Sequence, residues 1–278
     1  MSASRWSAST LEQLGAAACA AARTAADRIM AIYTGGFEVE HKSDASPLTA
    51  ADLASHRCLT SALAPLDTAA LVLSEESGPE AFAARRDARW LWLVDPLDGT
   101  REFVKRNGEF CINVALIEDG EVRLGLLLHP PSGTLWYAAS GLGAWRVDVG
   151  GRQPIRVLRP CPDLPRVAAS RSHGNAAVEA YYAALGPVER VPQGSALKFG
   201  RLAEGALDVY ARLASRCSEW DVAAGQCVVE QAGGVVVDEH GEPLRYNRRD
   251  SVIVHNFLAW GDSGRPWLEG LRGLALHD

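Results

Sequence analysis

Residues 92–100 read WLVDPLDGT, an apolar run that ends in two carboxylates three positions apart. The β-rich run predicts a strand over residues 90–94. Asp95 and Asp98 then lie just past the strand and can be directed at one hard cation, because Pro96 stiffens the turn between them. An ordinary Asx-rich turn after a strand contains the same residues, so the motif alone leaves both interpretations open.

Gly99 and Thr100 complete the motif with backbone donors. If a short helix begins at this point, its first N–H groups and its dipole favour a phosphate oxygen. The segment can therefore hold a metal ion and a phosphate side by side.

Acidic residues occur at two further element ends. Glu75 and Glu76 follow the predicted strand Leu71–Ser74, at the kind of strand end where ligand sites of open sheets lie. A solvated acidic loop is the structural alternative. Asp221 opens a helix predicted to run to about Ala232, and there N-capping is the structural alternative.

Four carboxylates thus stand at the ends of apolar elements and can converge on one cleft: Glu75, Asp95, Asp98 and Asp221. Without a compensating positive charge, bringing these negative charges together would cost free energy. Oxygen ligands without histidine or cysteine favour Mg²⁺, and two such ions stabilise the attacking and leaving oxygens of a phosphoryl transfer. The pattern indicates a magnesium-dependent phosphoryl-transfer site.

The flanking sequence predicts a mixed α/β chain. Helices are expected over residues 10–34 and 50–63, the second capped by Thr49 with Asp52 in its first turn. A hairpin turn at residues 119–120 makes the sheet partly antiparallel. The other expected elements are strands at 110–117, 122–128, 134–138, 235–238 and 252–255, and helices near 175–185, 195–206 and 222–232.

Residues 150–165 are rich in proline and glycine and form the predicted boundary between two lobes. The N-terminal lobe, residues 1–150, would carry most of the metal ligands. The C-terminal lobe, residues 151–278, would carry Asp221 and the residues that bind substrate.

The composition restricts the partners. The 278 residues are 47% hydrophobic and 22% charged, as in globular domains. A net charge of −6 lacks the basic excess that binding to a nucleic-acid polymer requires. The longest uncharged stretch, Leu124–Trp145, contains Pro130 and Pro131 and does not read as a transmembrane helix. The six cysteines form no CxxC pair, and we expect buried free thiols in a cytoplasmic protein.

Three separated motifs carry a family resemblance. DPLDGT at 95–100, the preceding Glu75-Glu76 and WDVAA at 220–224 resemble the metal signature of the inositol monophosphatase superfamily. Four segments resemble more narrowly its 3′(2′),5′-bisphosphate nucleotidase branch: SPLTAADLASH (46–56), WLVDPLDGTREFVKRNGEFCINVALI (92–117), SRSH (170–173) and GSALKF (194–199). The resemblance, which runs from about residue 10 to 255, implies a layered αβαβα sandwich with two lobes and the active site between them.

The resemblance also implies roles for single residues. The ligands of two or three Mg²⁺ ions would be Glu75, Asp95, the Leu97 carbonyl, Asp98 and Asp221. The Thr100 hydroxyl and Glu75 would orient the attacking water, and Asp52 would assist through water on a further ion. The amides of Gly99 and Thr100 would hold the scissile phosphate. Glu76 would be a supporting residue.

A second phosphate of the substrate would bind in the C-terminal lobe. The resemblance assigns it to Ser195, Lys198 and Arg212, and the first two are predicted on one helix face at i and i+3. Arg171 and His173 of the SRSH segment would flank the nucleoside. The structural alternatives are a solvated helix charge, a surface ion pair and a loop histidine.

The implied activity is Mg²⁺-dependent hydrolysis of the 3′-phosphate of adenosine 3′,5′-bisphosphate to AMP by in-line attack of water. The sulfated nucleotide would be a further substrate, which places the enzyme in sulfur metabolism. We expect a lithium-sensitive, cytoplasmic monomer or homodimer. Two alternatives stay open: an inositol monophosphatase or broader small-molecule phosphatase of the same superfamily, and a non-catalytic, metal-dependent nucleotide-binding protein.

Overall fold

The computed structural model describes residues 4–41, 47–169 and 175–276. Its helices, including two 3₁₀ turns named η, are α1 Ala8–Gly35, α2 Ala50–Leu63, α3 Pro79–Ala84, η1 Arg85–Asp87, α4 Thr100–Val104, α5 Ala176–Ala184, α6 Leu197–Ala203, α7 Glu219–Gln231 and η2 Trp267–Leu271.

Most strands belong to two larger sheets. The seven-stranded sheet contains, in spatial order, β3 Leu71–Ser74, β4 Trp90–Asp98, β5 Cys111–Glu118, β6 Glu121–His129, β7 Thr134–Ala139, β8 Gly143–Asp148 and β9 Gly151–Pro154. The five-stranded sheet contains β11 Glu189–Pro192, β10 Arg166–Ala169, β12 Val209–Arg212, β16 Phe257–Trp260 and β14 Val235–Val237. Two small sheets pair β1 Val39–His41 with β2 Pro47–Thr49, and β13 Cys217–Ser218 with β15 Ile253–Val254.

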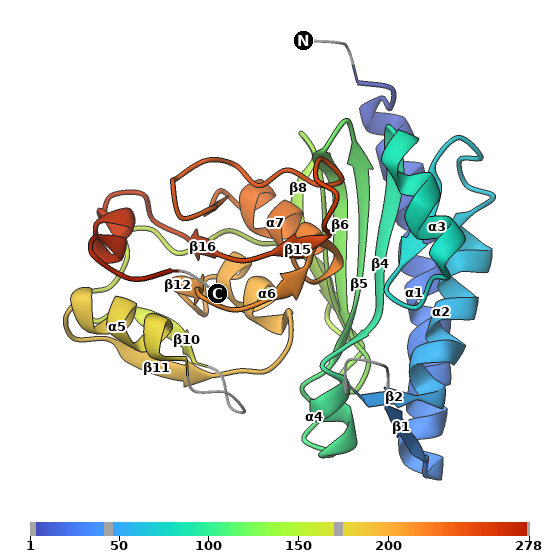
Figure 1. The fold of residues 1–278 in the computed structure, drawn as a ribbon, viewed down its shortest axis with the longest axis horizontal. Coiled ribbons are helices and arrows are strands. Elements are labelled where there is room, and N and C mark those ends of the chain that lie inside the picture. The colour runs from blue at the N-terminus through green and yellow to red at the C-terminus, as the bar shows by residue number, and fades with distance from the viewer. Residues whose placement is uncertain (1–3, 42–46, 170–174, 277–278) are drawn as a thin grey trace.

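Helices and sheets alternate in five layers (Figure 1). Helices α1 and α2 cover the outer face of the seven-stranded sheet, and α6 and α7 lie on its inner face, between the two larger sheets. Helix α5 and η2 pack together on the far side of the five-stranded sheet. The αβαβα architecture that the family resemblance implies is therefore confirmed.

The seven-stranded sheet is mixed, as predicted. β3 and β4 run parallel, and the other neighbouring pairs are antiparallel. β5 is buried along its whole length because helices pack against both faces of the sheet. A strand covered on both sides needs no polar alternation, which explains its nearly continuous apolar sequence.

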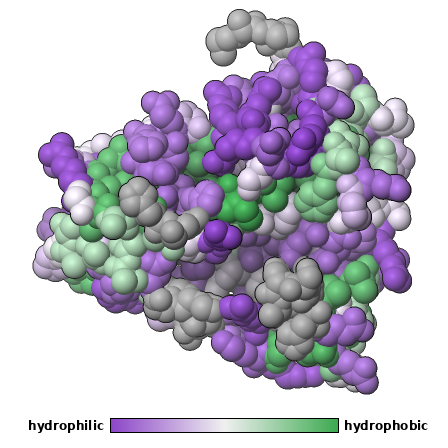
Figure 2. Space-filling view, viewed as in Figure 1, coloured by the Kyte–Doolittle hydropathy of each residue, from purple (hydrophilic) through white to green (hydrophobic). Residues whose placement is uncertain are grey.

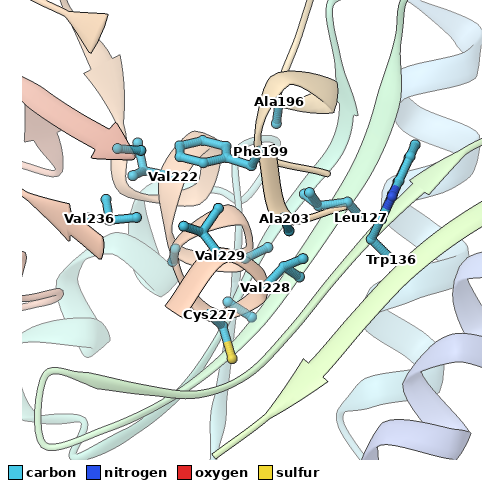
Figure 3. Close-up of a cluster of buried hydrophobic side chains, with 14 of the residues drawn as sticks. Leu127, Trp136, Ala196, Phe199, Ala203, Val222, Cys227, Val228, Val229 and Val236 are labelled. Atoms are coloured by element: carbon cyan, nitrogen blue, oxygen red, sulfur yellow. The ribbon is translucent and has the colours of Figure 1, made fainter. Parts of the chain in front are cut away.

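Apolar side chains fill the space between the layers in three clusters. Figure 3 shows one of them, where side chains of α6 and α7 gather against Leu127 and Trp136 of the seven-stranded sheet. Gly225 of α7 permits this packing, because a Cβ at that position would overlap the Phe199 ring and lie 2.8 Å from the Phe199 Cβ. The close contact fixes the two helices relative to each other.

The structure corrects three local predictions. β4 does not end at residue 94 but continues to Asp98, with irregular pairing to β5 after Asp95. Ser195 precedes α6 with a φ of 51°, so it does not share a helix face with Lys198. Helix α7 begins one residue after Ser218, which is its N-cap, so Asp221 is the third helical residue and not the cap.

The first two predicted helices are confirmed, and so is Thr49 as the cap of α2 with Asp52 in its first turn. Several elements were not predicted, among them α3, β8, β9, β11, β12 and β16. β9 is exposed throughout and has no apolar pattern, whereas in β8 Trp145 and Val147 alternate with Arg146 and Asp148, a strand pattern that the prediction did not use.

The cysteines are all free thiols, five of them buried and Cys19 half-buried. Within the residues that the structure describes, no helix is long and apolar enough to cross a membrane.

Candidate active site

Two adjacent strands present three of the acidic residues. The Glu75 amide, just after β3, donates to the main chain of the parallel neighbour β4 at 3.0 Å, one residue before Asp95. In the pairing of β4 with β5, Asp95 lies opposite Asn113 and Asp98 lies opposite Cys111, with the register shifting in between. Such an irregularity re-aims side chains at the end of a strand.

The fourth carboxylate, Asp221, lies in the first turn of α7. The charges of Glu75, Asp98 and Asp221 all act on Asp95, so the four carboxylates are neighbours. Burial raises the pKa of Asp95, and the charges of Glu75, Asp98 and Asp221 raise it further. Burial also raises the pKa of Asp98. Burial and then the charge of Asp98 raise the pKa of Asp221 to about 7. The structure thus brings together the carboxylates singled out in the sequence.

Each aspartate of this group has one oxygen held by the main chain. Asp95 Oδ1 accepts from the amide two residues further on at 3.0 Å, and Asp98 Oδ2 accepts from the Ala196 N–H. Asp221 Oδ2 accepts from the Ser218 N–H at 2.8 Å. Within the described residues, the second oxygen of each aspartate receives no hydrogen bond. The backbone therefore orients the side chains and leaves one oxygen of each for a ligand.

This donor set fits Mg²⁺. Magnesium prefers carboxylate oxygens and keeps several waters, and it takes substrate phosphate oxygens as further ligands. The raised pKa values show that the carboxylates are costly to ionise together, and a divalent cation offsets that cost. Among the described residues, no three histidine, cysteine, aspartate or glutamate side chains already lie close enough to enclose an ion. A closed protein cage is not needed, because water and substrate complete the shell.

A hydrogen-bonded pair, Thr100 and Asp52, lies beside the carboxylates. Helix α4 begins at Thr100, directly after Gly99 with its φ of 88°. Thr100 Oγ1 lies 3.1 Å from Asp52 Oδ1 and 3.1 Å from the Leu97 carbonyl oxygen. Asp52 Oδ2 accepts from the amide and the hydroxyl of Thr49 at 2.8 and 2.6 Å. Asp52 thus contacts the Thr100 hydroxyl directly, and its expected action through water on a further ion stays a prediction.

Two cavities adjoin these residues and share one wall. The smaller, of about 170 Å³, is lined by Asp98, Gly99 and Asp221 among others. The larger, of about 380 Å³, extends to Arg101, Asn175 and Arg216. The residues common to both linings are Lys198, Tyr210 and Arg212. The face seen in Figure 2 is hollowed near its middle, and mostly hydrophilic residues surround the hollow.

Lys198 and Arg212, both predicted to bind substrate, meet at this shared wall. Lys198 Nζ donates to the Ser195 carbonyl at 3.1 Å and lies 5.1 Å from the centre of the Tyr210 ring. Arg212 donates to the Arg216 carbonyl at 2.6 Å. Both cationic side chains are therefore placed between the two cavities.

The other predicted substrate residues are placed differently. Ser195 lines the smaller cavity and not the larger one, and its Oγ accepts from the Leu197 N–H at 3.3 Å. Arg171 and His173 lie outside the described residues.

The sequence did not single out several residues that border the site. Tyr210 belongs to the shared wall, while Arg101 and Asn175 border only the larger cavity. Cys111 lies opposite Asp98, a relation that depends on the pairing of β4 and β5 and leaves no local signal in the sequence.

Comparison with known proteins gives consistent matches. The profile of the inositol monophosphatase family matches residues 10–265. The 3′(2′),5′-bisphosphate nucleotidase CysQ of Escherichia coli (strain K12) is 42% identical over 241 residues, which cover 86% of this chain and 96% of the relative. The protein of the same name from Haemophilus influenzae is 33% identical, with 84% and 88% covered. Among solved structures, CysQ from Bacteroides thetaiotaomicron is 34% identical, with a TM-score of 0.76 and with 89% and 96% covered.

Proposed function

We propose that this chain, which belongs to the inositol monophosphatase family, hydrolyses the 3′-phosphate of adenosine 3′,5′-bisphosphate to AMP. The two nucleotidases compared above are 42% and 33% identical to it over most of their length. The observation that carries the proposal is a pair of adjacent cavities that share Lys198, Tyr210 and Arg212; the smaller one lies beside the carboxylates, and the larger one has two further arginines in its lining. A nucleotide with two phosphates can place one in each.

The cation-binding residues we assign are Glu75, Asp95, Asp98 and Asp221, with the Leu97 carbonyl beside them. They would hold two or three Mg²⁺ ions, which neutralise the carboxylates, polarise the phosphate and lower the pKa of water. The support is that burial and neighbouring carboxylates raise the pKa values of Asp95 and Asp221, and that main-chain hydrogen bonds orient these two and Asp98.

Thr100 and Asp52 would position the attacking water. When the Thr100 hydroxyl donates to Asp52, its oxygen keeps lone pairs that accept a hydrogen bond from that water. Glu75 would accept the second hydrogen of the water. The amides of Gly99 and Thr100 would hold the scissile phosphate. Attack in line with the departing ribose oxygen releases phosphate and AMP without a covalent phospho-enzyme.

The remote phosphate would bind at the shared wall. Lys198 and Arg212 can donate charge-assisted hydrogen bonds to it from that wall, and Arg101 and Arg216 add positive charge around the larger cavity. Four cationic side chains also suit the sulfated nucleotide, which has one more anionic group at its 5′ end. The assignment of Arg171 and His173 to the nucleoside stays a prediction.

Phosphate release tests the proposal directly. Adenosine 3′,5′-bisphosphate and inositol 1-phosphate are each incubated with the enzyme and Mg²⁺, with and without Li⁺. We expect strong preference for the nucleotide and inhibition by lithium. Preference for inositol phosphate would leave the assignment of the cation site standing and would contradict the role of the larger cavity in binding the nucleotide. Release from neither substrate would favour a non-catalytic nucleotide-binding protein.

A further inference from the structure

Cys111 is a buried thiol that the proposed reaction does not use. It is the first residue of β5, is 0% exposed and lies opposite Asp98 in the pairing with β4. Its Sγ lies 3.6 Å from Asp98 Oδ2, 3.4 Å from Ser195 Oγ and 3.3 Å from Asn113 Oδ1. One sulfur atom therefore contacts a proposed metal ligand and the segment that leads into α6.

A chain of polar contacts reaches Asp98 through this thiol. The Leu197 N–H donates to Ser195 Oγ at 3.3 Å, and the same Ser195 Oγ lies 3.4 Å from the Cys111 Sγ. Asp98 Oδ2 also accepts from the Ala196 N–H. One oxygen of Asp98 is thus held from two sides, by β5 and by the residues just before α6.

The thiol has one proton and three oxygens within reach. Of these three acceptor oxygens, only that of Asp98 belongs to a carboxylate. A hydrogen bond to an ionised acceptor is stronger than one to a neutral oxygen. The proton is therefore directed at Asp98, and not at Asn113 or Ser195.

The surrounding backbone leaves little room for rearrangement. Gly99 has a φ of 88°, and a Cβ there would lie 3.2 Å from the Ser195 Cβ. Ser195 itself adopts a φ of 51°. Because the two segments are already in close contact, they cannot simply close over a gap left at Cys111.

We propose that Cys111 is a positioning residue whose thiol fixes the rotation of the Asp98 carboxylate and so presents Asp98 Oδ1 to the divalent cation. The inference rests on the proposed cation site. Without the thiol, the Ala196 amide alone would hold Asp98 Oδ2.

Cation binding in the absence of nucleotide tests this role, with Mn²⁺ as the probe because it takes the same oxygen ligands and is detected by electron paramagnetic resonance. Cys111→Ala removes the donor, and Cys111→Ser restores one. The matched control is Cys227→Ala, since Cys227 is also buried and its Sγ donates to the Ala138 carbonyl at 3.6 Å, inside the cluster of Figure 3.

Loss of a group that orients a metal ligand weakens metal affinity or activity by about 10- to 100-fold, and a thiol is a weak donor. We therefore expect Cys111→Ala to bind Mn²⁺ about tenfold more weakly and to need correspondingly more Mg²⁺ for half-maximal turnover. The KM for nucleotide at saturating Mg²⁺ should not change. Cys111→Ser should recover most of the affinity, and Cys227→Ala should bind as the wild type does.

Three results would overturn the positioning role: wild-type affinity in Cys111→Ala, an equal loss in Cys227→Ala, or no recovery in Cys111→Ser. The binding measurement is independent of the nucleotide. A wild type that binds Mn²⁺ better than Cys111→Ala but releases no phosphate from the nucleotide supports the inference and contradicts the proposed function. A wild type that binds no Mn²⁺ overturns both.

Discussion

Lys198 should determine how strongly the enzyme prefers a nucleotide with two phosphates. It is only 8% exposed, and it lines both cavities at their shared wall, with Nζ beside the Tyr210 ring. Lys198→Met removes the charge and keeps an unbranched apolar side chain against that ring. We expect the variant to fold normally and to lose selectivity.

The size of the effect follows from one charge-assisted contact. A hydrogen bond to a charged group contributes about 1.5 to 3 kcal/mol. At about 1.4 kcal/mol for each factor of ten, the preference should fall by roughly 10- to 150-fold. The kcat/KM for adenosine 3′-monophosphate, which has no remote phosphate, should fall much less.

The assay is kcat/KM for adenosine 3′,5′-bisphosphate and for adenosine 3′-monophosphate with each variant. Lys105→Met is a matched control, because Lys105 is exposed and lines neither cavity. The reasoning would be refuted if Lys198→Met lost the same factor on both substrates. Lys198 would then act at the scissile phosphate or on Asp98, whose pKa its charge lowers.

Three further predictions concern the cation site, the core and the N-terminus. Asp98→Asn should abolish phosphate release while the circular dichroism spectrum and Tm stay near those of the wild type; near-normal turnover would contradict the assignment of Asp98 to the cation. Gly225→Ala should cost about 1 to 3 kcal/mol in urea unfolding because its Cβ would overlap the Phe199 ring, whereas Gly35→Ala, with no atom within 4 Å of its Cβ, should cost nothing. Burial raises the pKa of Asp67, but hydrogen bonds from Arg5, Ala69 and Trp6 outweigh it and lower the pKa. The stabilisation by the ionised carboxylate is present above the pKa of Asp67 in the unfolded chain and is lost as the pH falls through its pKa in the folded protein. At pH 7 the free energy of unfolding of Asp67→Asn should therefore be about 1 kcal/mol lower than that of the wild type, and this difference should shrink below about pH 4. A difference that persists in acid would exclude the ionised carboxylate as its cause.

The convergence of the carboxylates could be anticipated because each belongs to a short local pattern. Glu75 and Asp95 follow apolar runs that form neighbouring parallel strands, and the ends of such strands meet at one edge of a sheet. Asp221 lies near the start of a helix that the sequence marks clearly. In each case the information lies within a few residues, where strand and helix patterns are reliable.

Other features depended on contacts between distant segments and had no such pattern. The φ of 51° at Ser195 departs from the helix that its neighbours favour, so the expectation that Ser195 and Lys198 share a helix face was wrong. The opposition of Cys111 and Asp98 follows from a register shift between β4 and β5. The opposition of Cys111 and Asp98 can be recognised only once the two strands are paired.

The helices α2 and α7 place an acid at the site by the same local device. In each, the third helical residue is an aspartate, Asp52 or Asp221, and its Oδ2 accepts from the amide of the cap residue, Thr49 or Ser218. The hydrogen bond to the cap residue thereby fixes the side chain and leaves Oδ1 able to contact another group. At Asp52 this other group is the Thr100 hydroxyl. Capping and participation in the site use different oxygens of one carboxylate. For an aspartate in such a capping box, the structural and the functional interpretation are therefore complementary, and the pattern of the cap is no argument against a role in the site.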